Sequence, residues 1–157
     1  MDELRISQLT KEMVAEELRI LGDPCAAAAA VVKKTLTAAL QSAPAGTPPE
    51  TIIEDAVKGA MTALLLAEQS LARGGLLVLD AVLDVSAQAN LDPTESMRAA
   101  MRALADLRRF VDPSRIDDVR LAIESKYMGA GEVFAEFLRA PRKDLPMAEL
   151  DRNDSRF

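Results

Sequence analysis

Four dipeptides in which a helix-capping residue directly precedes proline divide this chain into segments. They are Asp23-Pro24, Thr47-Pro48, Asp92-Pro93 and Asp112-Pro113. An Asp or Thr side chain at the N-cap accepts hydrogen bonds from the first free amides of a helix, and proline at the next position lacks the amide that would stay unsatisfied. Glu50 and Glu95, each three residues after a cap, complete two predicted capping boxes. The dipeptides therefore predict four helix starts.

Glycine and asparagine residues mark where these helices are expected to end. The end signals are Gly22, Gly46, Gly74-Gly75 and Asn90, which tolerate left-handed backbone geometry. No segment alternates β-branched or aromatic residues with polar ones, and abundant alanine with 3% aromatic residues favours helix. We therefore predict an all-α fold. The expected helices cover residues 7–21, 24–43, 48–73, 75–90, 93–111 and 113–128, with a shorter seventh at 131–139.

The expected helix 75–90 is apolar around most of its circumference. Asp80, Asp84 and Gln88 form its narrow polar line. A helix that is apolar nearly all round is surrounded by other helices, and short loops make successive helices antiparallel neighbours. We therefore predict an antiparallel up-and-down bundle of about six helices around helix 75–90. It forms one domain, residues 1–140, followed by a flexible tail at 141–157.

The composition excludes several kinds of catalytic and metal site. The chain has no histidine and a single cysteine, Cys25, which rules out a Ser-His-Asp triad, a Cys-His pair, a His-containing zinc site and an internal disulfide. We expect Cys25 to be a small packing residue. A net charge of −6 argues against nucleic acid as a partner. The acidic start and the absence of a long apolar run predict neither a secretory signal nor a transmembrane segment, hence a cytoplasmic protein.

Carboxylates in the expected 48–90 hairpin form the one candidate metal site. A turn at Gly74-Gly75 places Glu68 and Asp80 at similar heights on two antiparallel helices, and Asp84 adds a third carboxylate. Oxygen ligands of this kind suit Mg²⁺ or Mn²⁺. However, acidic residues four apart also fit a solvated helix face. We favour that second interpretation and expect no cofactor, with Mg²⁺ or Mn²⁺ as the alternative.

Arginines on the expected helix 93–111 suggest either local ion pairs or a contact with an acidic protein. Arg98, Arg102 and Arg109 share one face of this helix. Guanidinium groups bind carboxylates through forked hydrogen bonds. The same row on a solvated face pairs with neighbouring acids instead, and we favour this interpretation.

An apolar group on the polar half of helix 48–73 predicts a covered surface. Its members are Met61, Leu65 and Leu66. Apolar clusters of this kind are covered by another part of the chain or by a partner. The candidate covers are the last helix, through Phe134, Phe137 and Leu138, and a second copy of the chain. The remaining alternative is that the group lines a groove for a ligand or lipid.

Three classes of function follow from these features. The leading one is a non-enzymatic helical interaction or scaffold protein that forms a homodimer. The second is a small all-α enzyme with a carboxylate-bound divalent metal. The third is an amphipathic protein that coats a surface in the manner of phasins, because the chain is rich in alanine and poor in aromatic residues.

Overall fold

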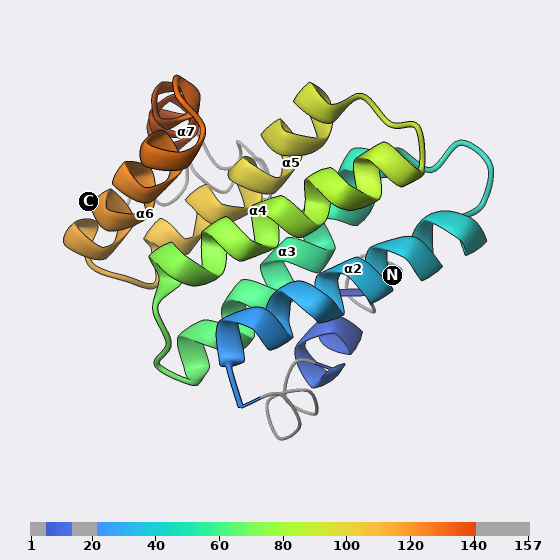
Figure 1. The fold of residues 1–157 in the computed structure, drawn as a ribbon, viewed down its shortest axis with the longest axis horizontal. Helices are drawn as coiled ribbons and strands as arrows, with labels where there is room; N and C mark the ends of the chain where they lie inside the picture. Colours follow the sequence, from blue (N-terminus) through green and yellow to red (C-terminus); the bar gives the residue numbers. More distant parts are fainter. Residues whose placement is uncertain (1–5, 14–21, 141–157) are drawn as a thin grey trace, which may run out of the picture.

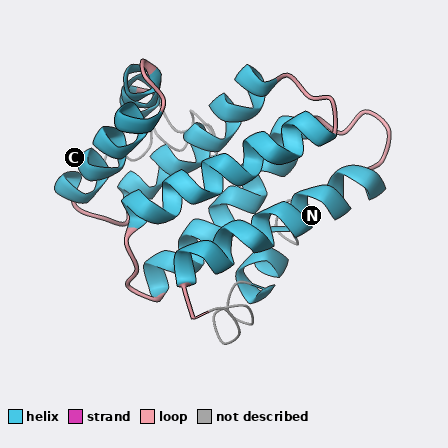
Figure 2. Ribbon diagram, viewed as in Figure 1, coloured by secondary structure: helices cyan, strands magenta, loops and turns pink. Residues whose placement is uncertain are grey.

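All regular elements in the described part of the chain are helices. The computed structural model describes residues 6–13 and 22–140 (Figure 1, Figure 2). The predicted all-α fold is confirmed, while the predicted tail 141–157 and residues 14–21 lie outside the described ranges. The elements are a helical segment at 6–13, α2 (Pro24–Ser42), α3 (Pro49–Leu66), α4 (Leu71–Gln88), α5 (Pro93–Ala105), the 3-10 helix η1 (Asp106–Arg109), α6 (Pro113–Lys126) and α7 (Ala130–Arg139).

Three of the four capping dipeptides begin a helix where predicted. α2, α5 and α6 start at the prolines after Asp23, Asp92 and Asp112. The Asp23 carboxylate accepts a hydrogen bond from the amide of Ala26, and that of Asp92 accepts from the amides of Thr94 and Glu95. These two side chains therefore satisfy helix-start amides as the pattern predicts.

The predicted cap at Thr47 is wrong. α3 begins one residue later than expected, at Pro49, and Pro48 occupies the N-cap without a side-chain hydrogen bond. A residue that precedes proline is driven to extended backbone, and Pro48 has φ −66° and ψ 128°. Because Pro48 itself precedes Pro49, it cannot be the first helical residue.

The predicted turn at Gly74-Gly75 is also wrong, because α3 ends at Leu66 and α4 begins at Leu71. Glu68 adopts a left-handed conformation with φ 56°. Its amide donates to the Leu65 carbonyl, and the amide of Gln69 donates to the Leu64 carbonyl. This is the Schellman arrangement, in which the left-handed position is usually glycine. Ser70 then caps α4 by accepting from the amide of Arg73.

The two glycines lie inside α4, where they allow close packing. A Cβ atom at Gly74 would lie 2.5 Å from Cδ1 of Leu64, and one at Gly75 would lie 3.6 Å from Cδ2 of Leu104. A side chain at Gly74 would therefore require the buried Leu64 side chain to shift, whereas one at Gly75 would make an ordinary van der Waals contact. The Gly74-Gly75 pair therefore lies within a packed helix and does not form a turn.

The helices form two layers, and helices two apart in sequence lie side by side. α2 and α4 make extensive contact, as do α3 and α5, and α4 also contacts α3, α5 and α6. In Figure 1, α2 and α4 cross the front while α3 and α5 lie behind them. α4 is thus surrounded as predicted. Successive helices reverse direction, but the bundle differs from a simple up-and-down one because α2–α4 and α3–α5 are its largest contacts.

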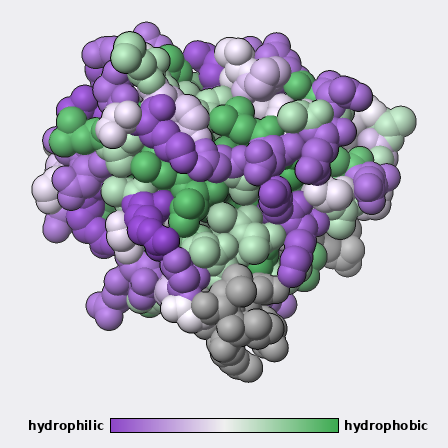
Figure 3. Space-filling model, in the orientation of Figure 1, coloured by the Kyte–Doolittle hydropathy of each residue, from purple (hydrophilic) through white to green (hydrophobic). Residues whose placement is uncertain are grey.

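Ion pairs show that neighbours within a layer run in the same direction. In the front layer, Arg73 at the start of α4 pairs with Asp23 at the start of α2, and Asp84 further along pairs with Lys33. Figure 3 shows apolar surface on this face, bordered by hydrophilic groups. None of the helices in the described part of the chain combines the length and apolar character that a membrane crossing requires.

α3 is buried around more of its circumference than its sequence pattern predicts. Met61 is fully buried and Asp55 is 7% exposed, although helical periodicity placed both on a polar half. α3 contacts α2, α4 and α5, and a Cβ at Gly59 would lie 2.5 Å from the carbonyl oxygen of Ser7. The helical segment 6–13 therefore covers a side of α3 that one apolar stripe cannot reveal.

Candidate functional site

The three carboxylates predicted as metal ligands do not form one cluster. Glu68 occupies the left-handed position of the α3–α4 turn, Asp80 contacts Lys126, and Asp84 pairs with Lys33 at 3.1 Å. The hairpin turn that placed Glu68 opposite Asp80 is displaced by several residues. Among the described residues, no three Cys, Asp or Glu side chains are grouped so as to hold a metal ion.

Asp80 instead ties α6 to α4. Its carboxylate accepts hydrogen bonds from the Tyr127 hydroxyl and from Nζ of Lys126, at the C-terminal end of α6. Burial raises the pKa of the Tyr127 hydroxyl above its usual range, and the hydrogen bond to Asp80 and the negative charge nearby raise it further. The phenol therefore remains a neutral donor, and the end of α6 is fixed.

Two of the three predicted arginines bind α7. The guanidinium groups of Arg98 and Arg102 lie 5.1 Å and 4.9 Å from the centre of the Phe137 ring. Arg102 also donates to Glu54 of α3 at 3.0 Å. A cation over an aromatic face is attracted by the ring quadrupole. These contacts fit the predicted local use of the arginine row, with an aromatic partner that the sequence pattern did not reveal.

The predicted apolar group divides between core and surface. Met61 lies in the core, so its assignment to an exposed contact is wrong; Leu65 is half-buried and Leu66 is 70% exposed. α7, one proposed cover, packs on α5 and α6. Leu66 thus remains open at the C-terminal end of α3.

Phe110 lies at the same end of the molecule as Leu66. Two ion pairs join α3 to α5 and η1: Glu54–Arg102 and, one helical turn further along, Lys58–Asp106. In each pair the two residues are 48 apart in the sequence. Because Asp106 is the first residue of η1, this register places the C-terminal ends of α3 and η1 at the same end of the molecule. Phe110, directly after η1, is 66% exposed.

A hydrogen bond from α6 also holds the α3–α4 turn, just after the C-terminal end of α3. Nη2 of Arg115, in the first turn of α6, donates to the carbonyl of Gln69 in the α3–α4 turn at 3.4 Å. The guanidinium of Arg109 lies 5.6 Å from the centre of the Phe110 ring. We call Leu65, Leu66 and Phe110 the end patch, with Arg109 beside it. The predicted residues Leu65, Leu66 and Arg109 therefore lie toward the same end of the molecule.

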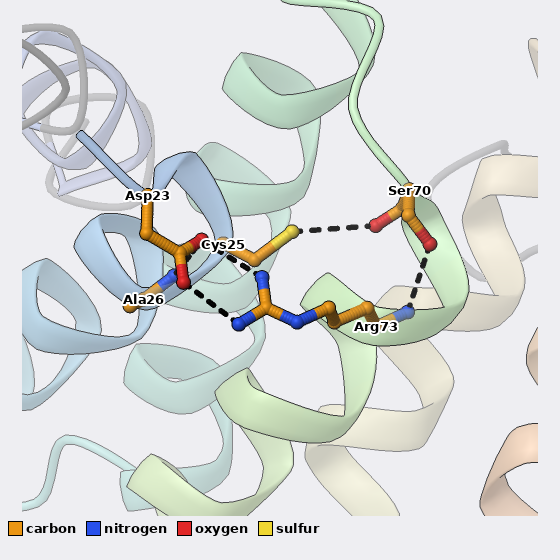
Figure 4. A network of polar contacts seen from close by, with 5 residues as sticks. All are labelled: Asp23, Cys25, Ala26, Ser70 and Arg73. Carbon is orange, nitrogen blue, oxygen red and sulfur yellow. Dashed lines mark hydrogen bonds and ion pairs between the residues drawn. The ribbon is translucent and has the colours of Figure 1, made fainter.

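A polar network joins the starts of α2 and α4 (Figure 4). Arg73 donates to both oxygens of Asp23 at 2.8 Å and 2.7 Å. These bonds hold the pKa of the Asp23 carboxyl at about 2. The buried Cys25 thiol donates to the carbonyl of Ser70 at 3.6 Å, and burial raises its pKa. Cys25 is therefore a packing residue that stays protonated, and the network acts as a structural tie.

The described residues line several hollows between the helices. A cleft of about 450 Å³ lies between α4, α5 and the α6–α7 turn, and a groove of about 500 Å³ lies between residues 6–13 and α2. The cleft contains the side chains of Met97, Met101 and Met128. Flexible thioether side chains suit irregular apolar surfaces.

Phe110 and Arg108 are the residues of interest that sequence reasoning missed. Both were placed inside a continuous helix 93–111, whereas α5 ends at Ala105 and η1 at Arg109. The Asp112-Pro113 start was a usable signal, because the residues just before a capped helix form a connection. A phenylalanine in such a connection has few neighbours to cover it.

No protein-family description matches the chain, and neither the curated proteins nor the solved structures compared with it are detectably similar.

Proposed function

We propose that this chain is a non-enzymatic helical interaction protein that self-associates through the end patch. The observation that carries the proposal is the exposure of Leu66 and Phe110, 70% and 66%, at one end of the molecule. Large apolar side chains gathered on a surface usually mark a contact site. Leu65, half-buried beneath them, extends the same apolar area into the core.

The chemistry of the end patch suits a contact between copies. Arg109 stacks on Phe110, and arginine with aromatic residues is enriched at the energetic centres of protein interfaces. A two-fold axis through the patch would place each copy's Leu66 and Phe110 against the other's. Because a two-fold contact uses the same patch on both copies, one substitution changes both sides of the interface.

Equilibrium sedimentation of the wild type and of Leu66→Glu tests this proposal. We expect a concentration-dependent dimer for the wild type and a lower association constant for a folded Leu66→Glu variant, because each dimer formed through the end patch would bury two added charges. Phe110→Glu should act in the same way. Met128→Glu is the matched control, since Met128 is 95% exposed at the opposite end of α6.

Two results would overturn the proposal. One is a wild type that stays monomeric at high micromolar concentration. The other is equal loss of the dimer in Leu66→Glu and Met128→Glu, which would mean that added charge alone and not the end patch is responsible. Circular dichroism of each variant establishes that the fold is retained.

A further inference from the structure

α7 is held by three anchors that all belong to other helices. Phe134 is fully buried, and the Phe137 ring is bound by the two guanidinium groups of α5. Arg108 of η1 fixes the end of the helix, because Nη1 donates to the Phe137 carbonyl at 3.0 Å and Nη2 to that of Ala140 at 2.9 Å. Carbonyls at a helix end lack intrahelical donors, so the third anchor recognises a helix terminus.

The connection between α6 and α7 is a three-residue hinge, Tyr127–Gly129. Its first residue is fixed to Asp80, its second, Met128, is 95% exposed, and its third, Gly129, has φ 89°. The closed hinge is held by the amide of Gly129, which donates to Glu124 at 3.0 Å. Opening the hinge therefore changes Met128 and Gly129 and leaves α6 in place.

We propose that two copies of this chain exchange α7, so that α7 of each copy docks on α5, η1 and α6 of the other. Every docking anchor joins α7 to those elements, so all of them re-form between copies. The closed and exchanged states differ in the hinge conformation and in the hinge's own hydrogen bonds, from Gly129 to Glu124 and from Ala130 to the Tyr127 carbonyl. The bond from Gly131 to Glu124 joins α7 to α6 and can re-form between copies. Exchange of an identical element is a low-cost route to a dimer, and short hinges favour it.

The exchanged contact is separate from the end patch and does not rest on it. α7 packs on α5 and α6, whereas Leu66 lies at the end of α3. The partner is a second copy because α7 itself carries the groups that this docking site binds. These groups are the Phe137 ring, which lies under the Arg98 and Arg102 guanidinium groups, and the terminal carbonyls, which accept from Arg108. A different protein would have to reproduce all of them.

Matched glycine variants test the exchange. In a Leu66→Glu background, which removes the end patch, Gly129→Ala should raise the association constant by roughly tenfold or more, because alanine strains the closed left-handed hinge and two hinges relax in each dimer. Gly46→Ala is the control. Gly46 has φ 90°, lies in the α2–α3 loop and, like Gly129, has no atom within 4 Å of an added Cβ.

Cross-linking between differently labelled copies identifies the exchanged helix. Met97→Cys in one preparation and Val133→Cys in the other, both with Cys25→Ala, place single thiols on α5 and α7 beside the same cleft. After the two are mixed and incubated, a short bis-maleimide should join one copy to the other, and more so with Gly129→Ala.

Equal association constants for Gly129→Ala and Gly46→Ala would overturn the exchange, and so would the absence of cross-linking between copies. Neither result bears on the end patch. That contact fails separately, if Leu66→Glu leaves the wild-type association constant unchanged.

Discussion

The four helices α2–α5 and the C-terminal pair α6–α7 are held in place by different kinds of contact. α2–α5 contribute most of the fully buried side chains, and glycines at 74 and 75 let their helices approach closely. α7 contributes one large buried side chain, Phe134, and depends on polar and cation–aromatic contacts for the rest. Burial over a wide area is cooperative, whereas a few separate anchors can be released together with one helix.

The largest expected effect lies in the first region. Leu79 of α4 is fully buried, and Leu79→Ala should lower the free energy of unfolding by about 2–5 kcal/mol through lost burial and a residual cavity. Chemical denaturation measures this loss. Leu121→Ala is the control, because Leu121 is 52% exposed. Similar losses for both variants would mean that α4 is not the centre of a packed core.

A smaller and more local effect is expected in the second region. Phe134→Ala removes the main apolar anchor of α7, and such a change in a rigid core costs about 3–5 kcal/mol. Here the global loss should be smaller, because α7 can detach while α2–α5 stay folded. Hydrogen exchange should become faster in α7 and remain slow in α3 and α4. Uniformly faster exchange would show that the two regions unfold as one.

The smallest effect concerns the tie between α2 and α4. The pKa of Asp23 is lowered to about 2 in the folded chain, against about 3.9 when unfolded. The stabilisation of the fold by the ionised Asp23 side chain is therefore fully present above about pH 4 and is lost as the pH falls toward 2. Because both partners are half-exposed, the contribution is small.

Asp23→Asn measures that contribution. The wild type should be slightly the more stable at pH 7, and the difference between the two should vanish near pH 2. A difference that is constant with pH would show that the ion pair with Arg73 does not contribute.

The sequence predicted helix starts well and the arrangement of helices less well. Asp23, Asp92 and Asp112 precede helix-starting prolines, because the fixed φ of proline acts locally. Asp23 and Asp92 also cap their helices, whereas Asp112 makes no side-chain cap hydrogen bond. The α3–α4 turn was missed because Glu68 takes the left-handed position that glycine usually occupies. Local propensity gave no warning of it, since Gly74 and Gly75 are the stronger turn signal in the sequence but lie inside α4.

The candidate site shows the same limit. Leu66 and Arg109 were identified by their faces on single helices, and both lie at the end patch. Phe110 lies toward the same end only because the Glu54–Arg102 and Lys58–Asp106 pairs, each between residues 48 apart, set the register of α3 with α5 and η1. Met61 was misplaced because a helical wheel shows one apolar stripe and cannot show how many neighbours surround a helix. Spatial proximity of this kind is set by packing rather than by local pattern.

The two-layer arrangement has a consequence for how the chain folds. Each described helix from α2 onward makes its main contacts with helices one or two places away in the sequence, and the ion pairs between α2 and α4 and between α4 and α6 join residues no more than about 50 apart. Closing a short loop costs less conformational entropy than closing a long one, and low contact order accompanies fast folding. The chain can therefore assemble by adding one helix at a time to a hairpin already formed, without first bringing its two ends together.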